Sequence, residues 1–125
     1  MGNSKNQSAA VLVVEDEPMI RMDTASFLEA AGFAVYEADN AAEAIRLLEL
    51  HDEIRLIFTD INMPGSMDGL ALAHYVRGRW PPLKIIVTSG YRKVRGNDLP
   101  VGALFIGKPY HPERIAHKMK ELVAA

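Results

Sequence analysis

The chain has 125 residues, of which 49% are hydrophobic and 24% charged, a composition typical of one globular domain rather than of a disordered or membrane protein. Its 14 Lys and Arg and 16 Asp and Glu give a formal net charge of -2, so no overall basic field favours binding to nucleic acid. The absence of cysteine excludes disulfides, thiolate metal sites and cysteine nucleophiles.

Residues 1–9 have the polar composition of a flexible leader and no secretory signal, so we expect one folded domain at residues 10–125. No later apolar run is long enough to cross a membrane. We therefore expect a cytoplasmic protein that neither inserts into membranes nor binds nucleic acid.

Apolar, β-branched runs alternate with helical patterns along the chain. The expected strands span residues 11–14, 33–38, 54–59, 84–88 and 103–106, and the expected helices span 18–31, 41–51, 70–78 and 112–123. Pro18 opens the first helix, Gly32 ends it, and Asn40 caps the second. Met19, Met22, Met63 and Met67 are expected to fill the core rather than form a binding stripe. Because parallel strands need crossover connections, this alternation predicts an α/β fold, an open parallel sheet with helices on both faces.

Polar side chains follow the predicted strands. In an open parallel sheet, ligands bind outside the carboxyl ends of the strands. The residues at these ends are Glu15 and Asp16 after the first strand, Asp60 after the third, Thr88 and Ser89 at the fourth, and Lys108 after the fifth. Since the strand ends of a parallel sheet meet at one edge, we expect these side chains to converge.

Glu15, Asp16 and Asp60 would repel one another unless a cation neutralised them. Mg²⁺ suits such a site because it takes oxygen ligands, keeps several waters and bridges carboxylates to phosphate oxygens. A carboxylate can itself attack phosphorus to give an acyl phosphate, while an ammonium and a hydroxyl group stabilise the transferred oxygens. The residues therefore predict a Mg²⁺-dependent phosphorylation switch at Asp60, with Thr88 and Lys108 beside it.

Four segments, in this order, resemble the receiver domains of bacterial two-component response regulators: VLVVEDEP, IFTDINMPGSMDG, IIVTSG and GKPY. The resemblance covers nearly the whole chain from Val11. It implies a flavodoxin-like (βα)5 three-layer sandwich with strand order 2-1-3-4-5. The fourth helix is degenerate here, because the stretch from Tyr91 to Leu99 has almost no apolar residues and predicts a loop or a single turn. The resemblance also implies a signalling protein, not an enzyme beyond self-catalysed phosphoryl transfer to Asp60 and hydrolysis from it.

The resemblance implies that a sensor histidine kinase, a histidine phosphotransfer protein or a small phosphodonor phosphorylates Asp60. In such a domain Asp16, Asp60 and the backbone carbonyl of Asn62 would bind Mg²⁺ directly, and Glu15 would act through water.

The same resemblance assigns the switch. Thr88 would bond the phosphoryl group and move toward it, Lys108 would pair with it, and the bond before Pro109 would be cis. Phe105 stands where the family often has tyrosine, so an aromatic switch would work without a hydroxyl.

The chain also departs from the family in two segments. The MPGSMDG turn is one residue longer than usual, which would reshape the rim where a kinase or phosphatase docks. The helix missing from residues Tyr91 to Leu99 belongs to the surface that most receivers use for dimerisation and output. We therefore expect signalling to an unknown downstream protein through a different face or a refolding loop, with a homodimer left open. Because no output domain follows Ala125, we expect a stand-alone receiver.

Alternatives remain at this stage. An interaction module with this fold need not be phosphorylated, although intact Asp60, Thr88 and Lys108 argue against it. A phosphohydrolase with an aspartyl-phosphate intermediate usually has a second acid where this chain has Asn62. A flavin carrier would need a phosphate-cradling loop after the first strand, where acidic residues would repel the phosphate.

Overall fold

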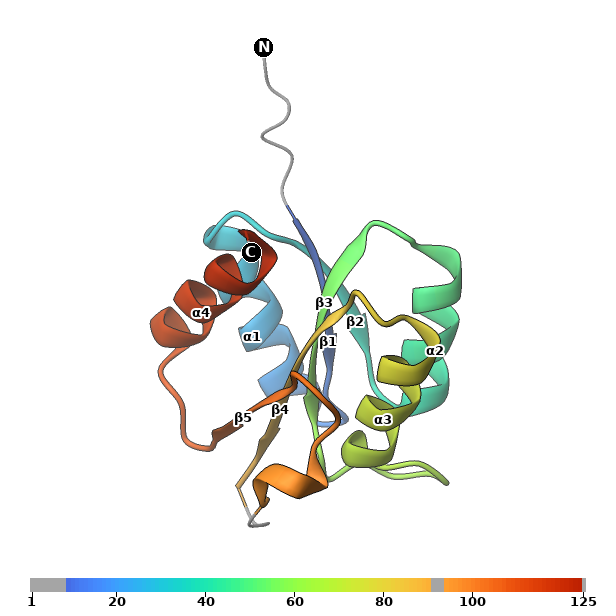
Figure 1. Cartoon of the computed structure of the whole chain (residues 1–125). Coiled ribbons are helices and arrows are strands. Elements are labelled where there is room, and N and C mark those ends of the chain that lie inside the picture. Colours follow the sequence, from blue (N-terminus) through green and yellow to red (C-terminus); the bar gives the residue numbers. More distant parts are fainter. Residues whose placement is uncertain (1–8, 91–93, 125) are drawn as a thin grey trace.

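The computed structural model describes residues 9–90 and 94–124 (Figure 1). Residues 1–8 of the expected leader lie outside this range. Among the described helices, none combines the length and hydrophobicity needed to traverse a lipid bilayer.

Five parallel strands form a single sheet. They are β1 (Ala10–Val14), β2 (Ala34–Ala38), β3 (Ile54–Asp60), β4 (Lys84–Ser89) and β5 (Leu104–Gly107). Their order is β2-β1-β3-β4-β5, which confirms the predicted flavodoxin-like topology. The strand order reverses between β1 and β3, and this is the point at which ligands bind in such sheets.

Helices cover both faces of the sheet. They are α1 (Pro18–Ala30), α2 (Ala41–Leu50), α3 (Gly69–Arg79) and α4 (Pro112–Ala124). In Figure 1, α1 and α4 lie on one side of the sheet, and α2 and α3 lie on the other. The observed bounds of the helices and strands agree with the expected ones within about a residue or two. Asn40 caps α2 as predicted, because its Oδ1 accepts the backbone N–H of Glu43 at 2.8 Å.

The strands are buried on both faces because their side chains alternate between two hydrophobic clusters. In β1, Leu12 packs on the side of α2 and α3, while Val11 and Val13 pack on the side of α1 and α4. Ile57 and Phe58 of β3 divide in the same way. This double burial requires the continuous apolar runs found in the sequence.

Met63 and Met67 pack against the core as half-buried side chains, but the expectation that Met19 and Met22 fill the core is wrong. They are 70% and 56% exposed. The buried residues of α1 are Ala25 and Leu28, and helical spacing places Met19 on the opposite side of the helix and Met22 at its flank. The apolar composition of the first turn therefore did not indicate which side faces the sheet.

The described residues of the connection from β4 to β5 contain no α-helix. Of the segment from Tyr91 to Leu99, residues 91–93 lie outside the described range, and residues 94–99 contain one 3₁₀ turn, Gly96–Asp98. The prediction of a loop or single turn is confirmed for the described part. Val94 and Leu99 cover the sheet there as half-buried side chains packed against the α2 and α3 side.

Candidate functional site

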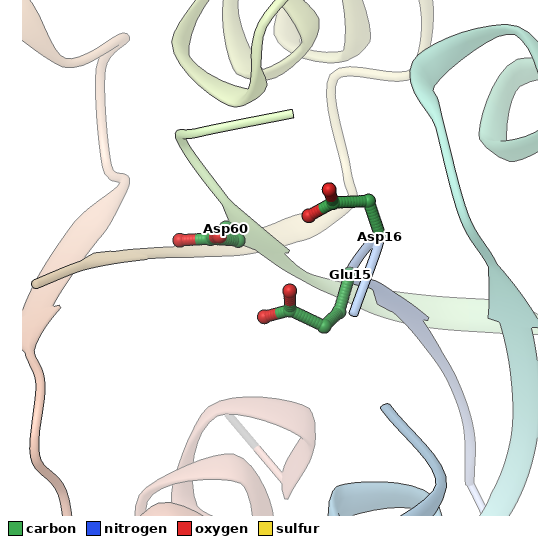
Figure 2. A group of neighbouring side chains, drawn as sticks. All are labelled: Glu15, Asp16 and Asp60. Carbon is green, nitrogen blue, oxygen red and sulfur yellow. The ribbon is translucent and has the colours of Figure 1, made fainter. Parts of the chain in front are cut away.

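Three carboxylates meet at the carboxyl edge of the sheet, as predicted. Glu15 and Asp16 follow β1 directly, and Asp60 ends β3. The two strands are neighbours, with Val14 paired to Thr59, so the chain leaves both strands side by side. One oxygen from each carboxylate lies within 4.8 Å of the others, and Figure 2 shows the three side chains around a shared space.

Burial makes this arrangement electrostatically unfavourable. Glu15 and Asp60 are each only 5% exposed, whereas Asp16 is exposed. Burial raises the pKa of Asp60, and repulsion from Asp16 raises it further. Burial also raises the pKa of Glu15, and repulsion from Asp60 adds to it. The site thus carries more negative charge than its own surroundings neutralise.

Among the described residues, Lys108 supplies the only opposite charge that contacts the carboxylates of Glu15 and Asp60. It follows β5, and its backbone N–H donates to the carbonyl of Ser89 at 3.1 Å. Its Nζ lies 3.3 Å from Glu15 Oε1 and 3.5 Å from Asp60 Oδ1. Burial lowers the pKa of Lys108, but attraction to the two carboxylates outweighs it, so the pKa is raised and the ammonium stays charged. The peptide bond to Pro109 is cis, as expected.

Thr88 lies beside Asp60. It is the Cα partner of Asp60 in the β3–β4 ladder and is buried. Among the described residues, Thr88 Oγ1 and Asp60 Oδ1 are buried side-chain oxygens that receive or donate no hydrogen bond. Buried polar atoms normally have a partner, so this pair fits a polar group bound between the two side chains.

The donor set suits a hard divalent cation. Three carboxylates offer only oxygen ligands, one of them exposed, which matches the preference of Mg²⁺ for a few carboxylates and retained water. A divalent cation would also relieve the repulsion that raises the pKa values of Asp60 and Glu15.

A family model of the response regulator receiver domain matches residues 11–120. The chain belongs to this family. It is a receiver domain of the two-component signalling type.

Two curated relatives show how such receivers occur. The response regulator receiver protein CpdR of Brucella abortus is 33% identical over 118 residues, which are 92% of this chain and 97% of that protein. The sensor kinase CckA of the same organism is 36% identical over 120 residues, but the match spans 93% of this chain and only 13% of the kinase. Receivers similar to this chain therefore occur both as nearly entire proteins and as small parts of longer ones.

Solved structures agree with the fold. A response regulator receiver protein from Sinorhizobium medicae superposes with a TM-score of 0.87 at 25% identity, covering 96% of this chain and 98% of that one. The response regulator TrrA of Thermotoga maritima, solved in complex with Mg(2+)-BeF, has a TM-score of 0.79 at 28% identity, covering 90% and 97%.

Two other predicted residues lie near the receiver's site but not inside the charged cluster. Asn62 is exposed, and its Nδ2 donates to Ser89 Oγ at 3.3 Å, while the role of its backbone carbonyl stays a prediction. Phe105 is half-buried in β5, paired with Val87 and packed against the α2 and α3 side. Its switching role stays a prediction as well.

Gly69 is a residue of the receiver that the sequence analysis missed. It begins α3, and its N–H donates to the carbonyl of Ile61 at 2.9 Å. A Cβ at this position would lie 1.9 Å from the backbone oxygen of Asp60. Only glycine allows the helix to begin this close to the backbone of Asp60. The spacing alone, nine residues after Asp60, gave no signal of the contact.

Arg21 is the second residue that was missed. Its Nη1 donates to the carbonyl of Glu15 at 2.9 Å, and its Nε donates to Glu37 at 3.2 Å. A signal was present in the sequence, because Arg21, Ala25 and Leu28 have the i, i+4, i+7 spacing of one helix face. A cation at the start of a core-facing series indicates a polar partner beneath it.

Proposed function

We propose that this receiver accepts a phosphoryl group on Asp60 from a sensor histidine kinase, a histidine phosphotransfer protein or a small phosphodonor. The observation that carries the proposal is a pair of buried oxygens without a hydrogen bond, Asp60 Oδ1 and Thr88 Oγ1, beside the Lys108 ammonium that pairs with Asp60. A phosphoryl group would satisfy both side chains and place its negative charge next to Lys108.

Glu15, Asp16, Asp60 and the backbone carbonyl of Asn62 are the groups that would hold Mg²⁺, with Glu15 acting through water. When bound, Mg²⁺ would neutralise charge on the carboxylates and on the phosphoryl oxygens. The all-oxygen cluster and the raised pKa values of its two buried members support this assignment. The related TrrA structure contains Mg(2+)-BeF, which also supports it.

The chain's own groups divide the chemistry between them. An Asp60 carboxylate oxygen forms the new bond to phosphorus as the bond from phosphorus to the donor atom breaks, and the donor departs with that electron pair. Lys108 stays charged and stabilises the extra negative charge on the transferred oxygens. Thr88 donates its hydroxyl hydrogen to one of these oxygens. The same site hydrolyses the acyl phosphate, and no other substrate is proposed.

Signalling would follow from these new contacts. Thr88 would move toward the phosphoryl group, and Phe105 would change its packing in response. The resulting surface would be read by a downstream protein in the cytoplasm, with a homodimer as one form of output. The sensor kinase CckA contains a receiver similar to this chain, and this similarity supports a histidine kinase as the source of the phosphoryl group.

Phosphorylation with a small donor tests the proposal directly. With acetyl phosphate or phosphoramidate and Mg²⁺, intact-mass spectrometry should show the added mass of one phosphoryl group. Asp60→Asn should lose this product, and EDTA should suppress it. Asp52→Asn, which changes an exposed carboxylate in the turn after α2, is the matched control and should be labelled normally. A folded wild-type protein that is never labelled would favour a phosphorylation-independent interaction module.

A further inference from the structure

Arg21 connects α1 to the backbone of the acidic edge. Its side chain is 19% exposed and reaches from the start of α1 back to the residue that follows β1. Nη1 donates to the Glu15 carbonyl at 2.9 Å, and Nε pairs with Glu37 in β2 at 3.2 Å. One guanidinium therefore links β2, α1 and the loop that carries Glu15 and Asp16.

The bonded carbonyl belongs to the peptide group between Glu15 and Asp16. A peptide group is planar, so fixing its oxygen fixes the plane that leads into Asp16. Asp16 is exposed, and among the described residues its carboxylate accepts no hydrogen bond. The position of this carboxylate therefore depends on its backbone.

Glu15 does not depend on Arg21 in this way. Its N–H donates to the Ala38 carbonyl at 3.0 Å, its Oε2 accepts from the Glu17 N–H at 3.1 Å, and its Oε1 pairs with Lys108. Loss of the Arg21 contact would leave these three anchors in place. The carboxylate whose position would change is therefore that of Asp16.

Glu37 determines how Arg21 acts. Paired with Glu37, the guanidinium is held in a fixed direction and its charge is compensated close by. It contacts a carbonyl and leaves the carboxylates of the acidic cluster without a competing cation at that position. Without Glu37, Arg21 would be free to turn toward those carboxylates and oppose a metal ion.

We infer that Arg21 is a positioning residue of the metal site: it holds the Glu15 carbonyl so that Asp16 faces Asp60, and Glu37 holds Arg21 in place. This inference rests on the proposed Mg²⁺ site. It assigns part of the metal affinity to a contact between a helix side chain and a backbone carbonyl.

The test measures Mg²⁺ binding to the full chain by isothermal titration calorimetry, together with the rate of labelling by phosphoramidate at saturating Mg²⁺. Arg21→Ala should weaken Mg²⁺ binding about 10-fold, as loss of groups that orient metal ligands commonly does. Its labelling rate at saturating Mg²⁺ should return close to the wild-type rate, because Arg21 touches no reacting atom. A general loss of structure would lower both the Mg²⁺ affinity and the labelling rate at saturating Mg²⁺.

Three further variants keep the test decisive. Arg21→Lys should recover part of the affinity, since it keeps a donor for the carbonyl but loses the fork that also reaches Glu37. Glu37→Gln leaves α1 intact, and we expect it to lower the Mg²⁺ affinity less than Arg21→Ala does. Arg46→Ala removes an exposed Arg that pairs with Glu43 on α2, and it should bind Mg²⁺ like the wild type.

Two results would overturn the inference: wild-type Mg²⁺ affinity in folded Arg21→Ala, or an equal loss in Arg46→Ala. If Arg21→Ala does not fold, unchanged affinity in both Arg21→Lys and Glu37→Gln would overturn it instead. Absence of Mg²⁺ binding to the wild type would refute the proposed metal site itself, which is a separate failure and is read from the first titration.

Discussion

The acidic edge and the β4–β5 connection both adjoin the end of β4, but they are stabilised in opposite ways. At the edge, buried Glu15 and Asp60 have raised pKa values, with Lys108 as their partner cation. In the described part of the connection, one 3₁₀ turn is the only helical element, and side chains of α3 donate hydrogen bonds to two backbone carbonyls. The edge concentrates charge that a bound ligand would neutralise. The connection gains order from a neighbouring helix.

The contacts from α3 are specific. His74 Nε2 lies 2.7 Å from the carbonyl of Asp98, so this nitrogen must carry the proton. Arg77 Nε donates to the carbonyl of Val101 at 2.8 Å, and its Nη1 donates to Pro81 at 2.6 Å and Leu83 at 2.7 Å. One Arg thus joins α3 to the segments before β4 and before β5.

The largest effect is expected at the edge, where α3 begins against Asp60. Gly69→Ala should lower the free energy of unfolding by about 2–4 kcal/mol, because its Cβ would collide with backbone atoms that cannot move aside. Gly78→Ala is the control in the same helix, since nothing lies within 4 Å of its Cβ. It should raise stability by about 0.5–1 kcal/mol. Urea denaturation measures both, and equal stabilities would refute the close approach.

Arg77→Ala tests whether the connection depends on α3. It removes charge-assisted hydrogen bonds to three carbonyls, and we expect a loss of about 1–3 kcal/mol in urea denaturation. Arg79→Ala removes a more exposed Arg that pairs with Glu49, donates to Tyr75 and lies over the Trp80 ring, and it should cost less, about 0.5–1 kcal/mol. A larger loss in Arg79→Ala than in Arg77→Ala would contradict the assignment. Labelling of Asp60 should survive in both variants.

Asp60→Asn should stabilise the metal-free protein by a few degrees in Tm, because it removes a buried charge that repels its neighbours. The pH dependence has a definite sign. Burial, with repulsion between the carboxylates, raises the folded-state pKa values of Asp60 and Glu15, so the folded protein binds protons before the unfolded chain does. Without metal, stability should increase as pH falls from neutral toward the ordinary pKa values of 3.8 for Asp and 4.5 for Glu.

Thermal melts in EDTA between pH 7 and 5 measure this effect. Asp60→Asn should show a shallower rise, and saturating Mg²⁺ should flatten the rise in the wild type. Below this range the trend should reverse, since Glu43 and Glu121 have pKa values lowered by hydrogen bonds from Arg46 and Lys118 and lose these contacts when protonated. A wild-type stability that falls steadily from pH 7 would show that the edge is not under electrostatic strain.

The smallest effect is expected for His74→Ala, which removes one hydrogen bond to an exposed carbonyl and should cost about 0.5–1 kcal/mol. Amide hydrogen exchange in residues 94–103 should become faster, while exchange in β1 and β3 should not change. His117→Ala, at an exposed pair with Glu121 on α4, is the control and should leave residues 94–103 unaffected. Unchanged exchange in His74→Ala would show that the order of residues 94–103 does not depend on the His74 contact.

The sequence by itself determined the sheet and most of the site. Continuous apolar runs ending in polar residues mark parallel strands buried on both faces, and the carboxyl ends of such strands must meet at one edge. For this reason Glu15, Asp16, Asp60, Thr88 and Lys108 could be placed together without coordinates. The weak helical pattern after β4 likewise predicted that no regular helix forms there, as the described residues 94–103 bear out, because a helix without an apolar face has nothing to pack against the sheet.

Only the tertiary structure determined which residues of different elements are in contact. No local sequence pattern encodes how two elements are placed relative to each other. Gly69 matters because α3 begins against the backbone of Asp60, and His74 and Arg77 matter because the β4–β5 connection passes beside α3. Met19 was misjudged and Arg21 missed for one shared reason: burial on a helix follows the face that meets the sheet, and this face includes Arg21 with Ala25 and Leu28. Periodicity predicts that such a face exists, whereas packing determines which polar groups it meets.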